Sequence, residues 1–186
     1  MYGLRVVTGP TAEPVSLAEA RAHCRVDTAN EDAVLVGLIL AARQYAEEIT
    51  GRAFLTQTLE LTLDCFPAWK IELPRSPVAS ITSITYLDTA GASDTVTSYV
   101  LDGRSRPPRL TPAYGESWPD VRATAGCVAI RFVAGESDAP EPIRQAILLM
   151  VGHWFEHRED AVIQSGVAVS MVPHGVDALL APYRVW

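Results

Sequence analysis

Two histidines near the end of a helix-like segment are the first residues that could carry chemistry. His153 and His157 flank Glu156 in a His-x-x-Glu-His pattern, which inverted zinc peptidases use to put two imidazoles one turn apart on a helix. Zinc would need at least a third protein ligand and an open position for water. The acids that follow closely, Glu159 and Asp160, stand almost beside His157 rather than on a second long helix. The sequence therefore favours a helix with a polar and aromatic end over a zinc hydrolase.

Other catalytic signatures are missing from the sequence. It contains no glycine-rich phosphate loop, no Gly-x-Ser-x-Gly elbow and no Cys-x-x-Cys pair. Cys24, Cys65 and Cys127 are odd in number and far apart, which predicts small buried hydrophobic residues in a reducing compartment. The paired acids Glu47 and Glu48 are predicted to be solvated surface. We therefore expect a protein that is not an enzyme and needs no cofactor.

Composition places the chain among ordinary globular proteins. Its 186 residues are 48% hydrophobic and 20% charged, enough for one core without disulfides or metals. The formal charge of −7 and the single lysine argue against binding to nucleic-acid phosphates. The densest basic cluster, Arg104, Arg106 and Arg109, lies in a proline-rich stretch and is predicted to be a solvated loop. With no signal-like or membrane-length apolar run, we expect a soluble protein made in a cytoplasm.

Two helices are predicted in the first quarter of the chain. Ser16 and Glu19 form a capping-box pattern that begins a short helix ending near Val26. Thr28 with Glu31 repeats this signal before a stronger helix. The apolar stripe of that helix follows three-four spacing and consists of Leu35, Leu38, Ile39, Ala42, Tyr45, Ala46 and Ile49. Its second half is one-sided, with Arg43, Gln44, Glu47 and Glu48 away from the stripe. Its first half is apolar nearly all round because of Val34, Val36 and Leu40, so that half needs partners on more than one side.

A β-rich middle and a last helix follow. Alternation of apolar and polar residues begins at Thr56 and predicts a strand to Cys65. Four further strands are predicted over 70–73, 80–87, 95–101 and 127–133, with a hairpin turn at 88–91 and a long loop over 103–121. The last helix is predicted from Asp138 to about Asp160, with an apolar stripe formed by Ile143, Ala146, Ile147, Met150, Val151 and Trp154.

The C-terminus is unusually apolar for a chain end. It finishes with Val176, Leu179, Leu180, Tyr183, Val185 and Trp186. Burial of each large apolar side chain is worth roughly 1.5 to 3 kcal/mol, so such a tail is predicted to dock. The pattern leaves open whether it docks on its own subunit or on another.

Several of these segments together resemble a known family. They are Ser16 to Asp27, Glu31 to Arg52, Pro140 to Glu159 and Leu179 to Arg184. They resemble the head-tail connector, or adaptor, family of head completion proteins in long-tailed phages and gene transfer agents. The Ile81 to Asp88 stretch is similar to the longer version of the family, in which strands are inserted between the helices.

The resemblance implies an α+β fold and a structural role. Residues 1–171 would form one adaptor domain, with a small helical bundle from 14–55 and 138–160 and a β-rich insertion over 56–137, and residues 172–186 would form an extended docking arm. In the family, such subunits form a dodecameric ring between the portal protein and the stopper, and DNA passes through the bore only as cargo. The implied location is the head-tail junction of a virion or phage-like particle, assembled in the bacterial cytoplasm, with no membrane partner.

The resemblance also assigns roles to residues. The portal-binding arm would use Val172, Pro173, Val176, Leu179, Leu180, Pro182, Tyr183, Arg184 and Trp186. The ring-forming helices would use Leu35, Leu38, Tyr45, Ile147 and Trp154. Two alternatives remain open: a soluble binding module with a β-rich recognition face, and a zinc hydrolase acting through His153 and His157.

Overall fold

The structure, a computed structural model, describes residues 2–103, 105–157 and 174–185. The chain forms two compact units. One unit is β-rich and comprises residues 1–11, 51–137 and 185–186; the other is helical and comprises residues 12–50 and 138–184. Helices and antiparallel sheets thus occur together in one chain, which confirms the predicted α+β class.

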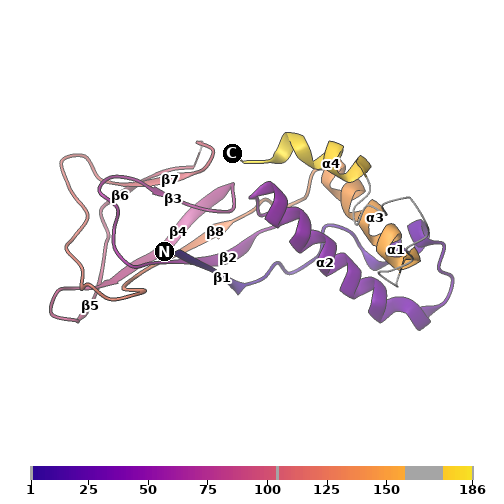
Figure 1. The fold of residues 1–186 in the computed structure, drawn as a ribbon, viewed down its shortest axis with the longest axis horizontal. Helices are drawn as coiled ribbons and strands as arrows, with labels where there is room; N and C mark the ends of the chain where they lie inside the picture. Colours follow the sequence, from indigo (N-terminus) through magenta and orange to yellow (C-terminus); the bar gives the residue numbers. More distant parts are fainter. Residues whose placement is uncertain (1, 104, 158–173, 186) are drawn as a thin grey trace, which may run out of the picture. The chain divides into compact units, whose positions relative to one another are not determined.

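The helical unit has four α-helices and two short 3-10 turns in the part that is described (Figure 1). Their bounds are α1 (Leu17–Cys24), η1 (Ala29–Glu31), α2 (Asp32–Thr50), α3 (Glu141–Glu156), α4 (His174–Leu180) and η2 (Ala181–Tyr183). Helix α3 is central, because α1, α2 and α4 all contact it. Its predicted stripe is confirmed from Ile143 to Val151, whereas Trp154 is half-buried. A helix buried on this many sides must be apolar around most of its circumference.

The two predicted helix starts differ in outcome. The capping box is confirmed: Glu19 N donates to Ser16 Oγ, and Ser16 N donates to the Glu19 carboxylate at 2.8 Å. Arg144 of α3 pairs with the same carboxylate and also donates to the Pro14 carbonyl, which ties α1 to α3. The capping prediction at Thr28 is wrong, because Thr28 precedes η1 and its side chain makes no capping hydrogen bond.

Helix α2 is less one-sided than its sequence predicts. Its Leu35, Ile39, Ala42 and Ala46 face the core as expected. The prediction that Arg43 and Glu47 lie on the outer side is wrong, because both are buried. They pair with each other and with the incoming chain at Glu13, so their charges are compensated inside the unit.

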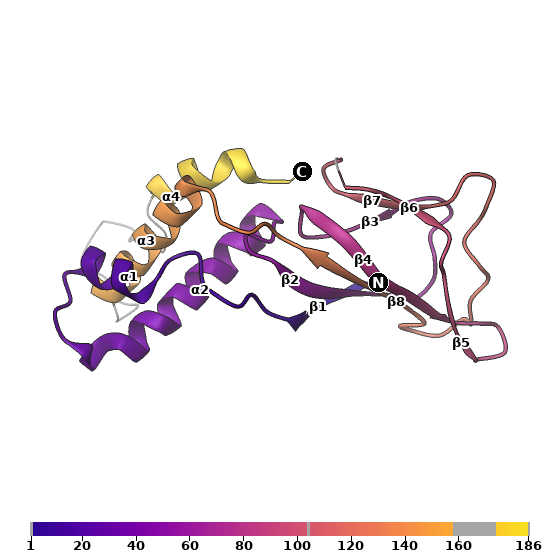
Figure 2. The ribbon, with the colours of Figure 1, turned by 180° about the vertical axis from the view of Figure 1, so that it is seen from behind.

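The β-rich unit contains two antiparallel sheets, seen from both sides in Figures 1 and 2. The five-stranded sheet has the order β1-β2-β8-β4-β5, formed by β1 (Tyr2–Thr8), β2 (Gln57–Leu63), β8 (Val128–Ala134), β4 (Val78–Leu87) and β5 (Ser93–Thr95). The three-stranded sheet has the order β3-β7-β6, formed by β3 (Ile71–Glu72), β7 (Arg109–Pro112) and β6 (Tyr99–Asp102).

The core of this unit follows from register and alternation. Ile130 of β8 lies opposite Leu61 of β2 and Ile84 of β4, so three fully or almost fully buried side chains meet on one face. The smaller sheet contributes Leu110, paired with Ile71. The period of two read from residue 56 onward therefore marks the buried face correctly.

Three features of the β-rich unit were not predicted. The segment expected as one strand over 95–101 is split between β5 and β6, and β7 lies inside the stretch expected to be a loop. Strand β1 was not predicted at all. It is an edge strand whose Val6 and Val7 are exposed, so its sequence carries no alternation between a buried and a solvated face.

The hairpin turn at 88–91 is confirmed. Asp88 N donates to the Ala92 carbonyl, and the Asp88 side chain accepts from Ala92 N at 2.8 Å. Gly91 has φ of +91°, a conformation that favours glycine.

Within the described residues, no helix is long and apolar enough to cross a membrane.

Candidate docking surfaces

The His153 and His157 pair lies as predicted on α3, with ring centroids 4.6 Å apart. His157 Nδ1 lies 3.0 Å from the backbone carbonyl of His153, which occupies one of its two nitrogens. Across the described residues no group of three or more His, Cys, Asp or Glu side chains could hold a metal ion. Glu159 and Asp160, the neighbouring acids considered as ligands, lie outside the described residues. Among the residues that the structure describes, the histidine pair therefore offers two potential ligands without a third.

The cysteines differ in exposure. Cys127 is buried and Cys24 is half-buried, as small hydrophobic residues should be, and burial together with Glu156 raises the pKa of the Cys24 thiol. The prediction for Cys65 is wrong, because this residue is exposed just after β2. All three are free thiols, and none forms a pair with catalytic spacing.

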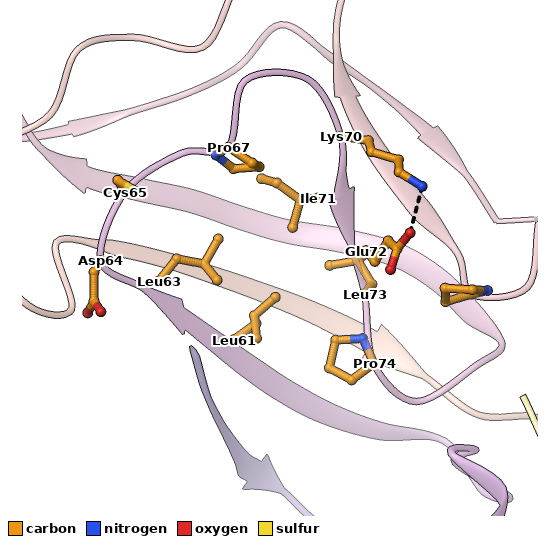
Figure 3. Close-up of a pocket in the computed structure, with 11 residues that line it drawn as sticks. Leu61, Leu63, Asp64, Cys65, Pro67, Lys70, Ile71, Glu72, Leu73 and Pro74 are labelled. Carbon is orange, nitrogen blue, oxygen red and sulfur yellow. Dashed lines mark hydrogen bonds and ion pairs between the residues drawn. The ribbon is translucent and has the colours of Figure 1, made fainter. Parts of the chain in front are cut away.

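A largely apolar pocket of about 530 Å³ opens in the β-rich unit between β2 and β3 (Figure 3). Leu61 and Leu63 line it from β2, and Ile71 and Leu73 line it from β3 and the residue after it. Lys70 and Glu72 form an ion pair at 2.6 Å on one wall, and Lys70 holds the pKa of Glu72 below its ordinary value. A carboxylate held ionised in this way is poorly suited to act as a general acid near neutral pH. The largely apolar lining of the pocket suits an apolar group.

The residues predicted to form the portal-binding arm fall into three groups. Val176 and Leu180 are fully buried within the helical unit, where α4 contacts α3 and α2. Leu179, Tyr183 and Arg184 are half-buried, and Pro182 is exposed. Val172, Pro173 and Trp186 lie outside the described residues. Val176 and Leu180 therefore dock on their own subunit. For these two residues, this decides between docking on the same subunit and docking on another one.

The residues predicted to form the ring also divide by burial. Leu35 and Ile147 are fully buried and belong to the core of the helical unit, so they cannot contact another subunit in this conformation. Leu38 and Trp154 are half-buried, and Tyr45 is 36% exposed with its ring edge-on to Trp154 at 6.1 Å. Val34, Val36 and Leu40 of α2, the residues from which the sequence predicted partners on more than one side, all face solvent.

Charge is distributed unevenly between the two units. Residues 12–50 and 138–184 contain 13 acidic and six basic side chains, a formal charge of −7. The β-rich unit contains nine of each and is formally neutral. Of the predicted basic cluster, Arg106 and Arg109 are exposed, consistent with a solvated loop and strand, and Arg104 lies outside the described residues. The entire net negative charge of the protein therefore belongs to the helical unit.

Comparisons with known proteins give a consistent result. A family profile described as phage gp6-like head-tail connector protein matches residues 14–105. A chain in a structure described as the neck of an empty GTA particle computed with C6 symmetry is 29% identical, with a TM-score of 0.81 over 99% of this chain and 96% of that one. A chain in the neck of a native GTA particle computed with C12 symmetry is 29% identical over the same shares, with a TM-score of 0.76. A chain in a virion of a native gene transfer agent (GTA) particle is also 29% identical, with a TM-score of 0.77 over 98% of this chain and 95% of that one. No curated protein matches the chain.

Proposed function

Because this chain belongs to the head-tail connector family, we propose that it is a structural adaptor subunit that forms a ring between the portal protein and the stopper of a phage-like particle. The observation that carries the proposal is the likeness to neck proteins over 99% of the chain, which includes both the helical and the β-rich unit. The role is structural rather than catalytic. The match to a head-tail connector profile and the likeness to neck proteins of particles support this role.

The ring would be dodecameric, as the C12 symmetry of a similar neck suggests. In a closed ring each subunit meets its neighbours through two different surfaces, because the contact is head-to-tail. Repetition around the ring also makes weak individual contacts sufficient, since many arms that engage one portal multiply a modest affinity.

DNA would pass through the bore as cargo without binding. The helical unit has an excess of seven acidic side chains, and such a surface repels phosphates. The exposed arginines described in the β-rich unit, Arg5, Arg106, Arg109 and Arg122, do not offset this repulsion, because that unit is formally neutral and binding to DNA requires clustered cations.

The portal-binding arm would be the C-terminal segment, divided into an anchor and a contact surface. Val176 and Leu180 would anchor α4 to its own helical unit, where both are fully buried. Leu179, Pro182 and Tyr183, which keep part of their surface exposed, would meet the portal together with the residues predicted at 172, 173 and 186.

A truncation tests this division. A chain ending at Leu180 keeps both anchors and removes η2 and the end of the arm. We expect it to melt close to the full chain, yet to lose co-purification with the portal protein of the same particle. Unchanged portal binding by this truncated chain would show that the end of the arm is not the contact. The matched control is Ala178→Ser, which alters an exposed residue of α4 and keeps the arm.

A further inference from the structure

The N-terminal half of α2 has an apolar side that the described residues of its own subunit leave uncovered. Val34, Val36 and Leu40 are 41%, 51% and 41% exposed, and Ala33, Gly37 and Ala41 are exposed beside them. The buried residues of α2, including Leu35 and Ile39, lie on the opposite side of the helix. A helix that is apolar nearly all round normally has partners on more than one side.

This surface differs from the rest of the same helix. One or two turns further on, the exposed side carries Gln44 and Glu48, beside the 36% exposed Tyr45. In the part of the chain that the structure describes, packing in the subunit's own core does not explain the apolar character of the first half, because that core is on the other side in both halves. Contiguous exposed apolar residues with a polar margin are typical of protein-protein contact sites.

The distribution of charge in the helical unit indicates which kind of partner this side of α2 can contact. Residues 33–42 contain no charged side chain, although they belong to the unit that carries the whole formal charge of −7. Two such units repel each other, and like charges buried in their contact would add to this repulsion. The exposed side of residues 33–41 is a surface on which two acidic subunits could meet without burying a carboxylate.

The shape of the surface also permits close approach. A side-chain carbon added at Gly37 would meet nothing within 4 Å, so the backbone there is open to a partner. Ala33 and Ala41 lie one turn before and after Gly37, and the larger Val36 and Leu40 flank this low strip. A strip of small residues beside larger side chains forms a shallow groove, and the ridges of a second chain can pack into such a groove.

We propose that this exposed apolar side of α2 is the surface through which one copy of the chain contacts the next copy in the ring, an inference that rests on the proposed adaptor function. The neighbouring copy contributes a different surface, because contacts in a cyclic ring are head-to-tail. The contact buries Val36 and Leu40 and keeps Gln44 at its solvated margin.

The test counts copies of the full-length chain bound to the purified portal ring by native mass spectrometry during a titration. The variants are Leu40→Asp and Val36→Asp. The control is Gln44→Asp, which adds the same charge one turn beyond Leu40 on the exposed side of α2. We expect the wild type and the control to fill the ring cooperatively. The two variants should need at least about tenfold more protein and should accumulate partly filled rings, since burial of one large apolar side chain changes an equilibrium by about that factor or more.

Three results would overturn the proposal. If Leu40→Asp and Val36→Asp fill the ring as the control does, this side of α2 is not the contact between copies. If they lower the melting temperature of the unassembled chain well below that of the control, a segment of the same chain covers the surface instead. If the wild type does not bind the portal ring at all, the adaptor function fails and the inference falls with it. The first two results leave the adaptor function intact.

Discussion

Arg43 donates a 2.8 Å hydrogen bond from Nη1 to Oε2 of Glu47, one turn further along α2, and both side chains are more than nine-tenths buried. Glu13 accepts from Nε of the same guanidinium at 2.7 Å. A buried ion pair adds little net stability, but removal of one partner is costly because the other charge is left uncompensated. This cluster fixes the chain that enters the helical unit against its longest helix.

Substitution of Glu47 tests this cluster. Glu47→Ala should lower the free energy of unfolding by about 3 kcal/mol, because Arg43 then keeps only Glu13 as a carboxylate partner. Glu48→Ala, the control, removes the same side chain from an exposed position and should cost less than about 1 kcal/mol. Urea denaturation measures both, and equal losses would mean that Glu47 is not buried as described.

Gly135 should tolerate no side chain. It has φ of +102°, and an added side-chain carbon would lie 2.1 Å from the backbone carbonyl oxygen of Leu55. Gly135→Ala should therefore destabilise the β-rich unit by more than about 3 kcal/mol or abolish soluble expression.

The control for this substitution is Gly115, which also has positive φ, at +82°, but has open space around it. Gly115→Ala should cost only about 1 to 2 kcal/mol, the cost of the backbone conformation alone. Similar melting temperatures for Gly115→Ala and Gly135→Ala would contradict the close approach at Gly135.

Acid should weaken a triad across β1, β2 and β8. Glu60 of β2 accepts from Arg131 at 2.7 Å and from Arg5 at 2.8 Å, and these hydrogen bonds hold the pKa of Glu60 below its ordinary value of 4.5. Because the folded state lowers this pKa, the triad contributes its stability above about pH 4.5. The contribution is lost as the pH falls through the lowered folded pKa.

The comparison of Glu60→Gln with the wild type checks this dependence on pH. At pH 7 we expect the variant to be less stable by about 1 to 3 kcal/mol, and the difference should shrink when the pH falls below 4.5. Glu116→Gln, at an exposed loop position, serves as the control. A difference between Glu60→Gln and the wild type that stays constant down to pH 3 would show that the triad is not ionised as described.

An aromatic cluster should order the long connection between β7 and β8. The rings of Phe66 and Trp118 stack at 5.0 Å, and Trp118 Nε1 donates to the Trp69 carbonyl at 2.8 Å. Trp118→Ala should therefore leave the fold intact and raise the rate of protease cleavage between residues 113 and 127 several-fold. Cleavage at the wild-type rate would show that Trp118 does not restrain this connection, and Tyr114→Ala, fully exposed on the same connection, is the control.

Local signals were readable from the sequence, and long-range ones were not. The capping box at Ser16 and Glu19 involves residues three positions apart, and the alternation in β2 marks one buried face, so both were predicted correctly. Strand β7 was missed because its Leu110 is fixed by pairing with Ile71 and Leu101, residues that no local pattern connects to it. Proline-rich surroundings predict a loop, but pairing on both sides overrides that preference.

The burial of the charged residues Arg43 and Glu47 could not be predicted from the sequence for a related reason. The sequence pattern places Arg43 and Glu47 on the solvated side of α2. In the structure this side is covered by the chain that enters the unit at Glu13. In the tail, the spacing of Val176 and Leu180 fits one face of a helix, yet the sequence could not tell whether that face belongs to its own core or to a partner. The structure assigns these two residues to the helical unit.

The most direct test of the adaptor function is cryo-electron microscopy of particles purified from the organism that encodes this chain. We predict density for twelve copies of the chain in the neck, directly below the portal, and heads without attached tails when the gene is deleted. Tailed particles of normal structure from the deletion strain, or a neck without this chain, would contradict the adaptor function.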